Sequence, residues 1–180
     1  MLMAPEINGP LAEMQGRLTD MTQMSARVGV NTGELLIQPK LSNPGIDLPS
    51  GGRYYVEKLR GHPFKVDGSS FFQVNTKQTE VLAEILLQRF GLNGSETVID
   101  AYAGVGIYAV LLAPSAARVI AIEESKSAVA DAKENAAGLE NVEFIEARTE
   151  DALGQIESPV DAIVLDPPRV GCHPDALKAV

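Results

Sequence analysis

The chain has 180 residues, of which 45% are hydrophobic and 22% are charged, and its formal net charge is -9 at pH 7. Such a chain can bury a sizeable core, and no apolar run approaches the roughly 20 residues of a membrane-spanning helix, so no membrane partner is expected. The N-terminus has no basic segment followed by an apolar one, so no secretory signal is expected there. The single cysteine excludes an internal disulfide and a thiolate metal site, and it favours a cytoplasmic location. The acidic balance argues only weakly against a nucleic-acid partner, because one local patch can still be basic.

The first part of the chain predicts a small antiparallel β module. Residues 1–24 carry scattered methionines without a period and predict a lead-in that is either poorly ordered or a short helix. Residues 25–70 predict the module, because short apolar runs alternate there with turn residues. Its expected elements are, in chain order, a hairpin over 26–38, a loop over 40–52, a strand over 53–59 and a turn at Gly61-His62-Pro63.

Residues 71–180 predict a Rossmann-like α/β domain. TKQTEVLAEILLQRF has helical spacing between an N-cap at Asn75 and an exit at Gly91. Its expected apolar face comprises Val81, Leu82, Ile85, Leu86 and Phe90. Strands then alternate with helices, which predicts a parallel sheet with right-handed crossovers. The expected strands are 96–102, 118–123, 141–147 and 160–166, and the expected helices are 107–113, 125–138 and a short piece at TEDAL. A doubly wound sheet usually continues beyond four strands, so we expect a domain that is incomplete at its C-terminus.

A glycine-rich turn follows the first of these strands. In DAYAGVGIY, Gly104 and Gly106 let the backbone turn tightly and approach a ligand, at the place where open α/β sheets bind ligands. Glu123 ends the second strand, where a carboxylate can accept hydrogen bonds from ribose hydroxyls. Asp100 and Asp166 end two strands that should be neighbours. This acidic rim favours a cationic nucleoside such as S-adenosyl-L-methionine over a pyrophosphate, although the loop alone does not exclude NAD.

Four segments taken together give a more specific pattern. FFQVNTKQTEVL, VIDAYAGVGIYAVLLA, VIAIE and VLDPPRVG resemble, in order and spacing, the RNA 5-methyluridine methyltransferases, which methylate C5 of uracil in ribosomal or transfer RNA. The resemblance covers about residues 70–175, and the β module looks like the central module of that family. It implies a class I S-adenosyl-L-methionine-dependent methyltransferase that serves RNA modification, such as rRNA processing.

The resemblance also implies a set of cofactor-binding residues. These are Gln73, Tyr102, Gly104, Gly106, Glu123 and Asp166. Gln73 would contact the methionine end of the cofactor, and Tyr102 would flank it. Glu123 would hold the ribose hydroxyls, and Asp166 would lie where the cofactor and the target base meet.

The catalytic nucleophile is not expected within this chain. In this family's mechanism a cysteine thiolate adds to C6 of a flipped-out uracil and makes C5 nucleophilic. That cysteine lies in an S-C-N-P-like segment after the D-P-P-R strand, so we expect it beyond Val180. Cys172 lies in the loop instead and is interpreted as an incidental thiol, which predicts cofactor binding without turnover. Ile107 and Ala147 stand where some members have Asn, so hydrogen bonds from those positions are not expected.

The expected partner of the parent protein is RNA, and two interpretations of its binding surface stay open. Basic and aromatic residues near the FFQVN segment could line an RNA path, but an ordinary strand with a solvated basic face is equally compatible. The set comprises Lys58, Arg60, Lys65, Lys77, Tyr54, Tyr55, Phe64, Phe71 and Phe72. The family's N-terminal RNA-binding barrel is not visible, so weak RNA affinity is expected. No metal site is expected, because His62 and His173 have no second ligand at metal spacing, and the oligomeric state stays open.

Two other functions remain open. The same Asp-Pro-Pro geometry could orient an amino group for methyl transfer, a reaction that needs no cysteine. The chain could also be a non-catalytic module that binds S-adenosyl-L-methionine or RNA.

Overall fold

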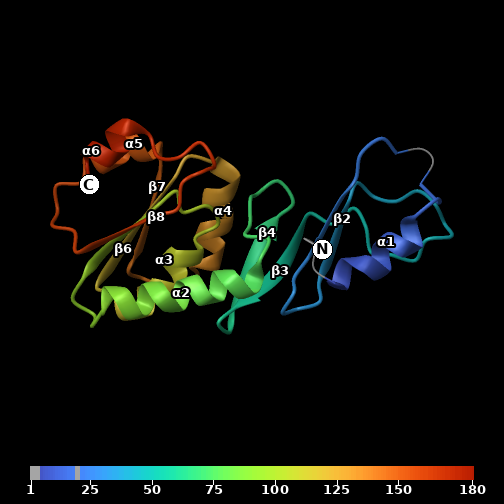
Figure 1. The fold of residues 1–180 in the computed structure, drawn as a ribbon, viewed down its shortest axis with the longest axis horizontal. Helices are drawn as coiled ribbons and strands as arrows, with labels where there is room; N and C mark the ends of the chain where they lie inside the picture. The colour runs from blue at the N-terminus through green and yellow to red at the C-terminus, as the bar shows by residue number, and fades with distance from the viewer. Residues whose placement is uncertain (1–4, 19–20) are drawn as a thin grey trace.

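The computed structural model describes residues 5–18 and 21–180. A four-stranded parallel sheet forms its C-terminal part, and two antiparallel sheets of two strands each precede that sheet. Figure 1 shows three units in chain order along the longest axis: a hairpin with a helix, a second hairpin, and the parallel sheet with its helices. The predicted fold class, a Rossmann-like sheet behind a small antiparallel module, is confirmed.

The parallel sheet has the strand order β7-β6-β5-β8, so the first of these strands in the chain lies inside the sheet. The strands are β5 (Thr97–Ala101), β6 (Arg118–Glu123), β7 (Val142–Glu146) and β8 (Ala162–Leu165). All three neighbouring pairs run parallel. Strands β5 and β6 are nearly continuous apolar runs because both of their faces are covered.

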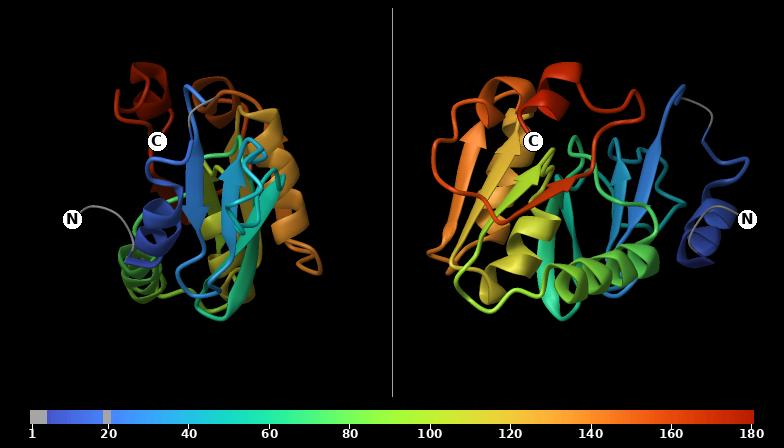
Figure 2. Two further views of the ribbon diagram at one scale, coloured as in Figure 1. Left: turned by 90° about the vertical axis from the view of Figure 1, so that its right-hand side faces the viewer. Right: turned by 60° about the vertical axis from the view of Figure 1, so that its left-hand side comes forward.

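Helices cover the two faces of this sheet. The helices are α2 (Thr76–Phe90), α3 (Ile107–Leu112), η2 (Ala113–Ser115), α4 (Lys126–Asn135), α5 (Thr149–Leu153) and α6 (Pro174–Lys178). Helices α3 and α4 pack with Val98 and Val119, whereas α5 and α6 pack with Ile99 and Ile120. This alternation follows from the period of two along a strand. Figure 2 shows α2 and α6 on opposite sides of the sheet.

Helix α2 begins and ends where its sequence predicts. The Asn75 side chain accepts a hydrogen bond of 3.2 Å from the N–H of Gln78, and Gly91 ends the helix in the left-handed conformation with φ 59°. No helix within residues 5–18 and 21–180 has both the length and the apolar character needed to cross a membrane.

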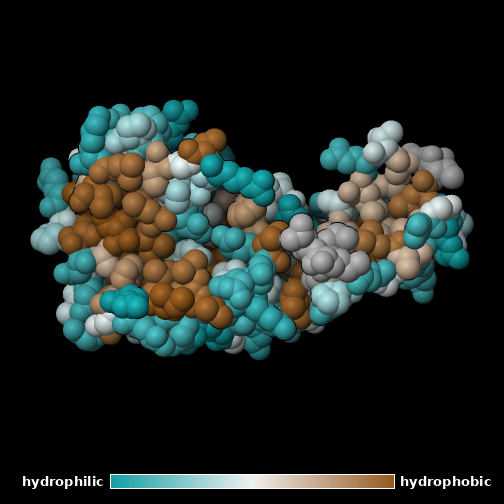
Figure 3. All heavy atoms as spheres, in the orientation of Figure 1, coloured by the Kyte–Doolittle hydropathy of each residue, from teal (hydrophilic) through white to brown (hydrophobic). Residues whose placement is uncertain are grey.

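The expected apolar face of α2 is wrong at three of its five residues. Val81, Leu82 and Ile85 are 41–50% exposed, and Figure 3 shows apolar surface along this helix. The helix instead buries small side chains such as Thr79 and Ala83. Small side chains let two elements approach closely, so the contact of α2 follows size as well as hydropathy.

The N-terminal unit is a hairpin that packs with a helix. Its elements are η1 (Pro5–Ile7), α1 (Asn8–Met14), β1 (Ser25–Val28) and β2 (Leu35–Gln38). Strands β1 and β2 pair antiparallel, as the sequence predicts, and Met14, Ile37 and Ile46 form the centre of a small core. Of the two expectations for the lead-in, the structure has the short helix over part of it; residues 1–4 and 19–20 lie outside the described residues.

The second hairpin joins β3 (Tyr54–Leu59) to β4 (His62–Asp67). Its turn is Arg60-Gly61, with φ 49° and 87°, the signs that a type I′ turn requires at both central residues. The predicted turn at Gly61-His62-Pro63 is therefore wrong at its last two residues: His62 pairs with Leu59, and Pro63 lies within β4. A proline is accommodated there because β4 has a free edge, where no partner strand needs its N–H.

A buried carboxylate connects these units. Glu57 on β3 is only 1% exposed. It accepts hydrogen bonds from the N–H of Val30 (2.7 Å) and of Asn31 (3.0 Å) in the turn of the first hairpin. It also accepts from the hydroxyl of Thr76 (2.7 Å) at the start of α2 and from the N–H of Lys58 (2.8 Å). One carboxylate therefore ties the first hairpin, the second hairpin and α2 together.

We expect Glu57→Gln to lower the free energy of unfolding by about 1–3 kcal/mol, because the amide turns one N–H group toward backbone donors. Urea unfolding followed by circular dichroism measures this change. The matched control is Glu140→Gln, at an exposed position, which should stay within about 0.5 kcal/mol of the unsubstituted chain. Equal effects of the two substitutions would show that Glu57 does not join the units.

Candidate functional site

The predicted site residues gather at the carboxyl ends of three adjacent strands. Ala101 of β5 lies beside Ile122 of β6 and Leu165 of β8 in the register of the sheet. The next residues along these strands, Tyr102, Glu123 and Asp166, therefore share one edge. This is the edge at which open α/β sheets bind ligands.

The loop from β5 to α3 is shaped by residues with positive φ. Tyr102 has φ 64°, Gly104 φ 55° and Gly106 φ 82°. At Gly104 an added Cβ would find no atom of the described chain within 4 Å, so a ligand can approach this backbone. At Gly106 an added Cβ would stand 3.1 Å from the Cβ of Ala132, so this glycine lets the loop lie against α4.

Glu123 holds this loop to the end of β6. Its Oε2 accepts a hydrogen bond of 2.8 Å from the N–H of Gly104, and its Oε1 accepts one of 2.8 Å from the N–H of Ser125. Because a carboxylate has about four lone-pair sites, two acceptor sites remain for a ligand. Glu123 is half-buried, so its position is fixed while one side stays accessible.

Gln73 and Asp166 meet although they are far apart in the sequence. The Gln73 side-chain amide donates a hydrogen bond of 2.9 Å to Oδ2 of Asp166. Burial raises the pKa of the Asp166 carboxyl, and the hydrogen bond from Gln73 opposes that rise. The segment between β4 and α2 is thus joined to the residue that follows β8.

Asp100 is the most buried acid of the site. It is 0% exposed, its Oδ2 accepts a hydrogen bond of 2.8 Å from the N–H of Ala109, and its Oδ1 has no partner among the described residues. Burial raises the pKa of Asp100 from 3.8 to about 7, the hydrogen bond from Ala109 opposes the rise, and the charges of Asp166 and Glu123 add to it. A cation at this edge would stabilise all three carboxylates.

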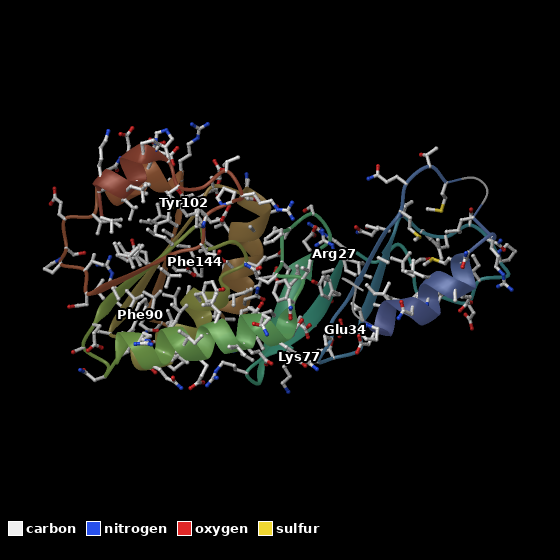
Figure 4. All side chains as sticks on the ribbon, in the orientation of Figure 1. Arg27, Glu34, Lys77, Phe90, Tyr102 and Phe144 are labelled. Atoms are coloured by element: carbon white, nitrogen blue, oxygen red, sulfur yellow. The ribbon has the colours of Figure 1, made fainter. Side chains whose placement is uncertain are left out.

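Tyr108 on α3 adjoins the acids of the site, and its one sequence signal is that it follows Gly106 by two residues. It is 5% exposed, burial raises the pKa of its hydroxyl, and the charges of Asp166 and Asp100 add to that rise. Tyr102 lies on the face of the sheet that α5 and α6 cover (Figure 4). Its hydroxyl oxygen is 3.4 Å from the backbone nitrogen of His173.

The suggested aromatic path for RNA is wrong for three of its rings. The side chains of Tyr55, Phe64 and Phe72 belong to the hydrophobic core and are not available for stacking. Two of the cations are engaged as well: Lys65 pairs with Glu134, and Arg60 pairs with Glu84. Tyr54 and Phe71 remain exposed.

Cys172 lies half-exposed in the loop between β8 and α6. It lies outside every strand that the structure describes. In the part of the chain that the structure describes, no group of three or more His, Cys, Asp or Glu residues could hold a metal ion.

The sequence pattern of the methyltransferase small domain family matches residues 75–176. Two curated relatives carry the name uncharacterized RNA methyltransferase. The protein from Clostridium tetani is 42% identical over 132 residues, which are 72% of this chain and 29% of that protein. The protein from Lactiplantibacillus plantarum is 37% identical over 172 residues, which are 93% of this chain and 36% of that protein. The chain thus spans about a third of the length of these relatives.

A solved structure shares the fold. It is the Pyrococcus abyssi tRNA (uracil-54, C5)-methyltransferase in complex with S-adenosyl-L-homocysteine, with a TM-score of 0.67 and 22% identity. The match covers 87% of this chain and 46% of that chain. It therefore includes the antiparallel units as well as the parallel sheet.

We expect Asp100→Asn to remove a pH dependence of stability. The pKa of Asp100 is raised in the folded state. Its stabilising contribution to the free energy of unfolding is therefore fully present below about pH 4 and is lost as the pH rises to about 7. Between pH 5 and 8 the free energy of unfolding of the variant should therefore rise relative to that of the unsubstituted chain, by on the order of 1–3 kcal/mol. Urea unfolding at several pH values measures the difference.

The matched control is Asp47→Asn, at an exposed position, for which the difference should not change over the same range. A constant difference for Asp100→Asn would mean that its carboxyl titrates in the folded state as it does in the unfolded chain.

Proposed function

Because the chain belongs to the methyltransferase small domain family, we propose that its site holds the cofactor for methyl transfer to C5 of uridine in RNA. The cofactor is S-adenosyl-L-methionine. When bound, it would supply a methyl group activated by a positively charged sulfur. The residues at the edge of the parallel sheet are those that we propose to bind it.

The chemistry of the site residues fits this cofactor. The exposed backbone at Gly104 permits close approach, and Glu123 keeps acceptor sites that suit the two ribose hydroxyls. Gln73 would contact the methionine end, and Asp166, which accepts a hydrogen bond from Gln73, would lie where the cofactor and the target base meet. Oδ1 of Asp100, which is buried and has no partner among the described residues, is a further acceptor close to this edge. Three carboxylates suit a ligand with positive charges and disfavour the pyrophosphate of a dinucleotide.

The observation that supports RNA as the substrate is the name shared by the two relatives, which this chain resembles over most of its length. The choice of uridine C5 rests on FFQVN upstream of the glycine loop together with DPPRVG downstream. In the structure these two segments meet through the Gln73–Asp166 hydrogen bond.

We propose further that residues 1–180 bind the cofactor without transferring its methyl group by themselves. The only thiol is that of Cys172, which lies in a loop and not in the strand segment that supplies the nucleophile in the resembling family. The roles of this chain would then be to hold the cofactor and to present Asp166 at the target base.

Calorimetric titration with S-adenosyl-L-homocysteine tests the cofactor site. We expect binding by the unsubstituted chain and a loss of about tenfold or more in affinity for Glu123→Gln and for Asp166→Asn, since each removes a charged acceptor. Glu124→Gln is the matched control, because Glu124 is adjacent but exposed and pairs with Arg148. A folded chain that gives no heat of binding, or equal losses in all three variants, would overturn the assignment.

The target is tested by disrupting the gene in its source organism and analysing nucleosides from purified rRNA and tRNA by mass spectrometry. We expect the loss of 5-methyluridine, and its restoration by a gene copy with Cys172→Ser. Loss of an N-methylated nucleoside instead would favour transfer to an amino group. Failure of the Cys172→Ser copy alone would make Cys172 the nucleophile.

A further inference from the structure

The outer edge of β4 is closed by side chains of α4 and not by a strand. Helix α4 lies beside β4 (Figure 1). Oδ1 of Asn135 accepts a hydrogen bond of 2.8 Å from the N–H of Lys65, and Nδ2 of Asn135 donates one of 3.1 Å to the carbonyl of Lys65. Oδ2 of Asp131, one turn earlier, accepts a hydrogen bond of 2.9 Å from the N–H of Asp67. Pro63, two residues before Lys65 on β4, has no N–H that needs a partner.

The same Asn135 amide also reaches the glycine loop. Its Nδ2 donates a second hydrogen bond, of 3.0 Å, to the carbonyl oxygen of Val105, which stands between Gly104 and Gly106. Both N–H groups and the oxygen of this amide are therefore used, in a residue that is 5% exposed. Ala132, one turn earlier on the same face of α4, lies where a Cβ on Gly106 would come within 3.1 Å.

These contacts connect two parts of the site that arise from different sheets. Strand β4 leads through a short turn to Gln73, whereas the glycine loop follows β5. Both must approach one ligand, and Glu123 fixes only the loop. Among the described residues, Asn135 has the side chain that hydrogen-bonds both to β4 and to the loop.

We propose that Asn135 is a positioning residue, which holds the glycine loop in register with the second hairpin and so sets the affinity of the site. The proposal rests on the proposed function, in which that loop binds the cofactor. Asp131 is the matched comparison, because it bonds to β4 alone and to no atom of the loop.

The test compares Asn135→Ala with Asp131→Ala by two measurements on folded protein. Thermal unfolding should show a lowered midpoint for both variants, because each leaves a backbone N–H of β4 without a partner. Titration with S-adenosyl-L-homocysteine should show affinity reduced about three- to tenfold for Asn135→Ala and unchanged within about twofold for Asp131→Ala. Equal losses of affinity in the two variants would reduce Asn135 to a purely structural role and overturn the proposal.

Hydrogen exchange of the chain without any ligand gives a second readout. Backbone amides of residues 103–109 should exchange faster in Asn135→Ala than in Asp131→Ala, whereas amides of β4 should be affected in both. If Asn135→Ala does not fold, Asn135→Ser, which keeps one donor, replaces it in both measurements. If the unsubstituted chain binds no S-adenosyl-L-homocysteine, the proposed function fails. Hydrogen exchange of the loop amides still decides whether Asn135 positions the loop. Unchanged exchange of these amides in Asn135→Ala overturns the proposal.

Discussion

The gathering of three carboxylates at one sheet edge is the constraint on which this molecule depends. The parallel register places Asp100, Glu123 and Asp166 at the carboxyl ends of neighbouring strands, and burial raises the pKa of both aspartates. Hydrogen-bond donors offset part of this cost. They are the backbone N–H groups of Ala109 and Gly104 and the side-chain amide of Gln73. One oxygen of Asp100 has no partner among the described residues, so a positively charged ligand would complete the set.

Polar side chains that lie between the sheets hold these groups together. Neither hairpin pairs with the parallel sheet, so the edge of β4 and the turn of the first hairpin need other partners. Asn135 supplies them on one side and Glu57 on the other, both nearly fully buried. Buried polar groups that use all of their hydrogen-bonding atoms fix one arrangement, because any shift leaves an atom unsatisfied. Directional hydrogen bonds therefore hold the units in place, in addition to apolar contacts.

Much of the fold and of the candidate site could be predicted from local sequence. Strands β5 and β6 are nearly continuous apolar runs. The caps at Asn75 and Gly91 mark the ends of α2 directly. What could not be predicted depends on contacts between distant residues. Pro63 looked like a turn residue, because nothing local says that β4 has an edge without a partner strand. The outward face of α2, the hydrogen bonds of Asn135 and the burial of Tyr108 depend in the same way on neighbours that arrive from other elements.

The most direct measurement is the number of protons released when S-adenosyl-L-methionine binds, obtained by calorimetry at pH 7 in buffers of different ionisation enthalpy. A cationic ligand beside Asp100 and Asp166 must lower the pKa of their carboxyls. We therefore expect the release of a fraction of a proton on binding, and a smaller release with S-adenosyl-L-homocysteine, which lacks the sulfonium charge. Binding with no release, or with proton uptake, would show that the ligand does not sit against these carboxylates.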